Sequence, residues 1–125
     1  MRLLLDSDAL IWHVLDDARL GPVPTAAIEA PDAEALVSVA SLWEIAIKSA
    51  IGKLRVPGDL PARIEGLGFE LLPITTAHAW QLRSLPHHHR DPFDRLLIAQ
   101  AQLERLAIVS ADDVFADYGV EVVWG

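Results

Sequence analysis

Four acidic side chains fall at positions from which they could share one metal ion: Asp6, Glu44, Asp94 and Asp112. Asp6 directly follows three leucines, and Asp112 closes the apolar stretch at 107–112. Glu44 and Asp94 stand near the starts of two apolar helical segments. Carboxylates crowded together repel one another and raise their pKa values unless a cation neutralises them. Because Mg²⁺ and Mn²⁺ prefer oxygen ligands, the set predicts a site for one of these hard divalent ions.

Each acid also has a local explanation. Ser41 and Glu44 match a capping box, with Ser41 at the N-cap and Glu44 returning to the cap amide. Asp91 and Asp94 fit the N-cap and third positions of a later helix, with a proline between them. Taken singly, Glu44 and Asp94 are explained better by capping than by metal binding. Capping does not explain Asp6, whose unpaired charge would be costly if buried, nor the gathering of all four.

The elements that must position these acids alternate between short apolar strands and longer helical segments, which is typical of a parallel α/β sheet. Ligands of such sheets bind at the carboxyl ends of the strands, where the four acids are expected. The strands are expected at residues 2–6, 34–39, 69–74, 107–112 and 121–124. The helices are expected at 9–17 with Ser7 as N-cap, from Thr25 between two prolines, and at 41–52, 62–68, 77–85, 91–106 and 113–119.

Composition narrows the classes of protein to which the chain can belong. Its 125 residues fit one domain spanning 1–125, and a net charge of −8 argues against nucleic-acid binding through a broad basic surface. A divalent ion answers that objection, because it makes an acidic pocket accept phosphate and can activate a water for attack on a phosphodiester. With no cysteine, no signal peptide and no apolar run of about 18 residues, we expect a cytoplasmic protein outside the membrane.

Four segments in this order resemble the PIN-domain family, specifically the VapC-like toxins of type II toxin–antitoxin systems. They are LLLDSDALIW, VSVASLWEIAIKSAIGKL, LPHHHRDPFDRLLIAQA and IVSADDVFADYGVEVVW. The resemblance implies a three-layer α/β/α fold around a mostly parallel sheet of about five strands. It also implies an endoribonuclease that depends on Mg²⁺ or Mn²⁺, is inhibited by a small cognate antitoxin and forms a homodimer. The apolar LIWHVL run could belong to an antitoxin groove or a dimer interface.

Carried over residue by residue, the resemblance assigns both metal binding and catalysis to Asp6, Glu44, Asp94 and Asp112. Asp91, part of the HRDPFDR variant, is interpreted as a helix cap that could also act in the outer shell of the metal. The remaining candidates for RNA contact or outer-shell support are Ser7, Lys48, Arg90, Arg95 and Ser110.

The histidines and tryptophans are interpreted without a metal role. Adjacent histidines cannot all face one ion, so His87, His88 and His89 are expected in a solvated loop near the RNA. His13 and His78 are expected on helix surfaces. The tryptophans Trp12, Trp43, Trp80 and Trp124 are expected in the core or in interfaces.

Three other functions compete with the ribonuclease. In a haloacid-dehalogenase-type phosphatase Asp6 would be the nucleophile and Asp8 the acid/base, but the chain is short and Glu44 and Asp94 would have no role. A phospho-receiver domain lacks its acceptor aspartate, because FELLPITT contains none. A PIN-like scaffold that binds without cleaving is disfavoured by intact acids at all four positions.

Overall fold

A computed structural model describes residues 1–125, and a five-stranded sheet forms its centre. The strands are β1 (Arg2–Leu5), β2 (Glu34–Ser38), β3 (Glu70–Leu72), β4 (Ala107–Val109) and β5 (Val122–Val123). They lie in the order β3-β2-β1-β4-β5, and every neighbouring pair is parallel. The expected α/β sheet is therefore confirmed. The chain moves outward from β1 in one direction and then returns to its other side, so the strand order reverses between β1 and β4. Such a reversal is where parallel sheets bind ligands.

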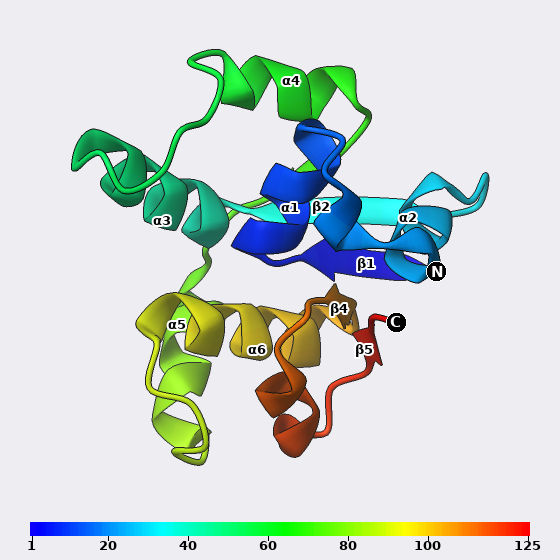
Figure 1. Ribbon diagram of the computed structural model, residues 1–125. Coiled ribbons are helices and arrows are strands. Elements are labelled where there is room, and N and C mark those ends of the chain that lie inside the picture. Colours follow the sequence, from blue (N-terminus) through cyan, green and yellow to red (C-terminus); the bar gives the residue numbers. More distant parts are fainter.

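Helices cover both faces of the sheet, giving the expected three layers (Figure 1). Leu3 and Leu5 pack into one core with α1 (Ser7–Val14) and α4 (Leu60–Gly66), whereas Leu4 packs into the other with α6 (Pro92–Glu104). This split follows from the alternation of side chains along a strand, and it explains why all three leucines are fully buried. The helices are α1 (Ser7–Val14), α2 (Pro22–Glu29), α3 (Val39–Ala50), α4 (Leu60–Gly66), α5 (Thr76–Gln81) and α6 (Pro92–Glu104). Three 3₁₀ helices complete the set: η1 (Ala18–Leu20), η2 (Leu82–Ser84) and η3 (Asp113–Tyr118).

The N-caps predicted for two helices are wrong. Asp6, not Ser7, is the N-cap of α1, and its carboxylate accepts a hydrogen bond from the Ala9 amide at 2.8 Å. The N-cap of α3 is Ser38, three residues before the expected Ser41, because β2 passes directly into this helix. The capping box predicted for Ser41 and Glu44 therefore does not exist. Glu44 lies almost two turns inside α3, where its carboxylate is free for other partners.

Other boundaries differ by a few residues. Helix α2 starts at Pro22 rather than Thr25, and each strand is shorter than expected. Asp91 caps α6 as predicted, with the proline in the first turn. Thr75 caps α5 and shares a capping box with His78.

Several side chains lie elsewhere than predicted. His78 is buried between α5 and α6 with 1% of its surface exposed, so the expectation of a helix-surface residue is wrong. His13 is half-buried, with its ring 5.3 Å from that of Phe69. Within the LIWHVL run Leu10 and Ile11 belong to the core, Trp12 and Val14 pack against it, and Leu15 is exposed.

The tryptophans divide into two pairs. Trp12 and Trp124 contact each other and pack against the core. Trp43 and Trp80 are 55% and 64% exposed, so they are not core residues. No helix has the length and apolar character needed to cross a membrane.

Candidate metal centre

The four predicted acids line one cavity of about 380 Å³ at the carboxyl edge of β1 and β4. Asp6 follows β1, Glu44 comes from α3, Asp94 from the first turn of α6, and Asp112 caps η3 just after β4. The cavity lies where the strand order reverses, as expected for a parallel sheet. Its full lining is Asp6, Ser7, Asp8, Glu44, Lys48, Asp91, Asp94, Ala111 and Asp112.

Asp6 lies at the buried end of this cavity. Burial raises its pKa to about 6 from the ordinary 3.8, and the charges of Asp8 and Glu44 act in the same direction. Hydrogen bonds from Ser110 and from the Ala9 amide oppose the rise. Asp6 therefore serves as helix cap and as pocket carboxylate, and its proton is held more tightly than that of an ordinary aspartate.

Glu44 is anchored by two predicted candidates. The Ser7 hydroxyl donates to one of its carboxylate oxygens, and the Lys48 ammonium lies 3.0 Å from the other. The hydrogen bond to Glu44 raises the pKa of Lys48. Because Ser7 follows β1 and Glu44 belongs to α3, their contact joins two elements that are distant in sequence.

Asp94 differs from the second half of a capping box, although it occupies the third position of α6. Its amide donates to Asp91, but the Asp91 amide donates to the His89 Nδ1 at 3.2 Å rather than to the Asp94 carboxylate. That carboxylate therefore faces the cavity. Burial, followed by the charge of Asp91, raises the pKa of Asp94 to about 7, while His89 lowers it.

His89 is the residue that the sequence analysis missed. Its Nε2 lies 3.0 Å from an Asp94 oxygen and 3.1 Å from an Asp112 oxygen, so the prediction of a purely solvated loop is wrong for this histidine. Since Nδ1 accepts the Asp91 amide proton, a neutral His89 carries its hydrogen on Nε2 and donates it to the carboxylates. The sequence signal that could have identified His89 was its position two residues before Asp91, the N-cap of α6. His87 and His88 remain exposed, as predicted.

The two arginines of RDPFDR behave differently from each other. The Arg95 guanidinium donates to the carbonyl oxygens of Pro86 and His89, among others, and holds the loop before α6. The prediction that Arg95 contacts phosphate is therefore not supported by its geometry. Arg90 is exposed, and neither residue lines the acidic cavity.

The donor set fits a hard divalent cation. Six carboxylates line the cavity with one lysine, so the negative charge exceeds what the protein itself neutralises. Ligand atoms of His89, Asp94 and Asp112 lie within 4.8 Å of one another, close enough to share one ion. Because His89 carries hydrogen on its facing nitrogen, the oxygens of Asp94 and Asp112 are the better ligands.

Comparison with known proteins agrees with this architecture. The PIN domain family profile matches residues 3–121, whereas a search of curated protein sequences finds no significant match. Among solved structures, VapBC2 from Rickettsia felis bound to promoter DNA is similar with a TM-score of 0.72 and 12% identity, covering 98% of this chain and 97% of that chain.

DNA-bound VapBC from Salmonella typhimurium gives a TM-score of 0.65 at 18% identity, covering 98% of this chain and 96% of that chain. FitAcB from Neisseria gonorrhoeae gives 0.58 at 22% identity, covering 96% and 95%. Identities this low establish a shared fold, and the family assignment rests on the sequence profile. The chain belongs to the PIN-domain family.

Proposed function

We propose that this protein is a metal-dependent endoribonuclease, the toxin of a type II toxin–antitoxin module, acting with Mg²⁺ or Mn²⁺. The observation that carries the proposal is the convergence of four carboxylates from four separate elements in one cavity. Two of them, Asp6 and Asp94, have pKa values raised to about 6 and about 7, mainly by burial and further by neighbouring carboxylates, and a bound cation would favour their charged forms. PIN-domain membership points to the same chemistry.

In this proposal Asp6, Glu44, Asp94 and Asp112 hold the ion. When bound, a divalent cation supplies a Lewis acid that lowers the pKa of a water and neutralises charge on a phosphodiester. The rest of the cavity positions the carboxylates.

The positioning residues act through hydrogen bonds. Ser7 and Lys48 orient the two oxygens of Glu44, and Ser110 donates to Asp6. The hydrogen on His89 Nε2 holds Asp94 near Asp112. Asp91 fixes the first turn of α6 and lines the cavity, where its charge raises the pKa of Asp94.

The proposed partners are RNA, a small antitoxin and a second copy of the chain. Similar chains were solved within VapBC assemblies and within a toxin–antitoxin complex from Klebsiella pneumoniae, which supports the antitoxin. We further propose that the whole chain acts as a single domain in the cytoplasm.

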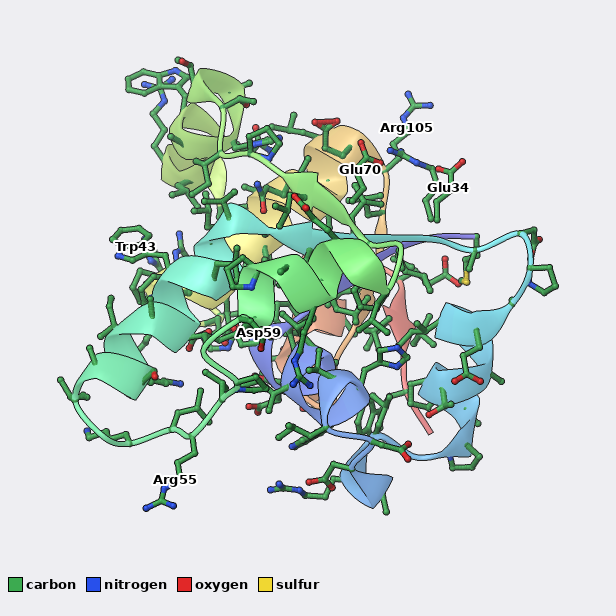
Figure 2. All side chains as sticks on the ribbon, turned by 90° about the horizontal axis from the view of Figure 1, so that it is seen from above. Glu34, Trp43, Arg55, Asp59, Glu70 and Arg105 are labelled. Carbon is green, nitrogen blue, oxygen red and sulfur yellow. The ribbon has the colours of Figure 1, made fainter.

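The test uses purified protein free of antitoxin, incubated with a structured RNA in Mg²⁺, in Mn²⁺ or in EDTA. We expect metal-dependent cutting that is lost in Asp6→Asn and in Asp94→Asn. The matched control is Asp59→Asn, because Asp59 is exposed and pairs with Arg63 on the outer layer of the protein (Figure 2). Its cutting rate should equal that of the wild type.

Two other outcomes would replace the proposal. Hydrolysis of phosphomonoesters that depends on Asp8 but not on Asp94 would indicate the phosphatase. Asp8 is exposed in the first turn of α1 and lines the cavity, so it is accessible for that role. Absence of turnover together with tight binding of a partner would indicate a non-catalytic scaffold.

A further inference from the structure

Acidic residues are absent from one long segment of this acidic protein. Between Glu70 and Asp91 the chain contains two arginines and four histidines but no aspartate or glutamate. The second half of this segment forms η2 and the loop that enters α6, directly beside the acidic cavity. In a protein of net charge −8, such a local basic region favours the binding of a polyanion in addition to any bound divalent ion.

A second cavity, of about 540 Å³, lies in this basic region. Its lining contains no carboxylate and consists of Leu82, His87, His89, Arg90, Pro92 and Arg95. His89 borders both cavities, because it lines this one while its Nε2 contacts Asp94 and Asp112 of the other. The two cavities are therefore neighbours that adjoin at His89.

The two arginines that line the second cavity form no ion pair with a carboxylate, unlike several cations elsewhere in the protein. Arg2, Arg19, Lys48 and Arg63 all form ion pairs with carboxylates. The Arg95 guanidinium instead donates to backbone carbonyls and to the Tyr118 hydroxyl, so it is fixed in place with its charge uncompensated. Arg90 forms no ion pair and is exposed, so its donors can reach a ligand.

We infer that this basic cavity binds a backbone phosphate of the RNA next to the bond that is cut. The inference rests on the proposed ribonuclease function, which puts the reacting phosphate in the acidic cavity. A neighbouring phosphate of the same strand then meets Arg90 and His87, within the field of Arg95. Arginine suits this role because its planar group can donate two hydrogen bonds to one phosphate.

The experiment measures binding of a fluorescently labelled single-stranded RNA at several salt concentrations, with Ca²⁺ in place of Mg²⁺ and with gels confirming that the RNA stays intact. Arg90→Ala is compared with Arg55→Ala, which removes an exposed arginine from the distant loop after α3 (Figure 2). We expect Arg90→Ala to weaken binding roughly three- to tenfold and to reduce the slope of log affinity against log salt by about 0.7. Arg55→Ala should change neither quantity.

The outcomes separate this inference from the function on which it rests. Wild-type binding with equal effects of Arg90→Ala and Arg55→Ala would overturn the basic subsite alone. A wild type that binds no RNA would overturn the subsite together with the ribonuclease. Weaker binding by Arg90→Ala with an unchanged salt slope would indicate a change of loop structure rather than a lost phosphate contact, and it would also overturn the subsite.

Discussion

Two histidines approach carboxylates beside helix α6, and their surroundings are opposite in character. His78 lies between α5 and α6, where its Nδ1 accepts the Thr75 amide and its Nε2 faces the single carboxylate of Glu104 at 3.2 Å. His89 faces two carboxylates in a cavity lined by six acids. Around His78, one histidine faces one carboxylate. Around His89, the six carboxylates of the cavity outnumber the positively charged groups that could pair with them. A polar cluster whose groups are all paired within the protein stabilises the fold. A cluster with more carboxylates than positive partners is suited to bind a cation.

The largest expected effect is on RNA cutting, and it distinguishes the carboxylate beside His89 from the carboxylate beside His78. Asp94→Asn should lower metal-dependent RNA cutting roughly 100- to 1,000-fold, because a ligand of the ion is lost. Glu104→Gln keeps the shape of its side chain outside the metal centre, and its cutting rate should remain within about twofold of the wild type. Initial rates at saturating Mn²⁺ measure both. Equal losses in the two variants would show that the comparison is mistaken.

Removing the internally satisfied histidine should act on stability. His78→Ala leaves a void and an unpaired Thr75 amide, so the free energy of unfolding should fall by about 2–3 kcal/mol. Urea denaturation measures this change. The control is His87→Ala, an exposed residue, for which we expect less than about 0.5 kcal/mol. A stable His78→Ala protein would show that this cluster does not hold α5 against α6.

The acidic centre should make the metal-free protein less stable as pH rises. The pKa values of Asp6 and Asp94 are raised in the folded state, so the folded protein holds protons that the unfolded chain has already released. The free energy of unfolding in EDTA should therefore fall between pH 4 and pH 7, by on the order of 1–3 kcal/mol. Thermal unfolding across this pH range measures the change. Adding Mn²⁺ at pH 7 should restore the stability that is lost in EDTA.

A variant isolates this effect from other titrations. Burial lowers the pKa of His13, which adds stability as pH rises and so opposes the trend. Asp94→Asn removes one carboxyl group whose pKa is raised and leaves His13 unchanged. Its unfolding free energy in EDTA should depend less on pH than that of the wild type. The same pH dependence in both proteins would mean that the raised pKa of Asp94 does not cause the loss of stability at higher pH.

The smallest expected effect concerns His89 itself. Because His89 lowers the pKa of Asp94, His89→Ala should let a proton compete better with the ion. We expect Mn²⁺ affinity to fall about three- to tenfold at pH 7 and to approach the wild-type value at pH 8.5, measured by titration calorimetry. Tighter binding by His89→Ala would instead mean that the imidazole competes with the ion for the two carboxylates.

The sequence alone determined the architecture and the four carboxylates predicted for the centre. Apolar strands alternating with helical segments require a parallel sheet, and acids that follow strands must gather at its carboxyl edge. Asp91 was also recognisable as a cap, because a cap is a local interaction within one turn. The family resemblance, based on motifs in order, was confirmed by the profile match.

The tertiary structure decided which side chains complete the centre. Glu44 receives the Ser7 hydroxyl across 37 residues, and His89 reaches Asp112 across 23. Local spacing cannot specify such partners, because they depend on how separate elements pack. For the same reason His78 was predicted on a helix surface but is buried. Likewise, Ser41 was predicted to cap α3, but the cap is Ser38, where β2 enters the helix. Local patterns set the elements, and contacts through space set the partners of each polar group.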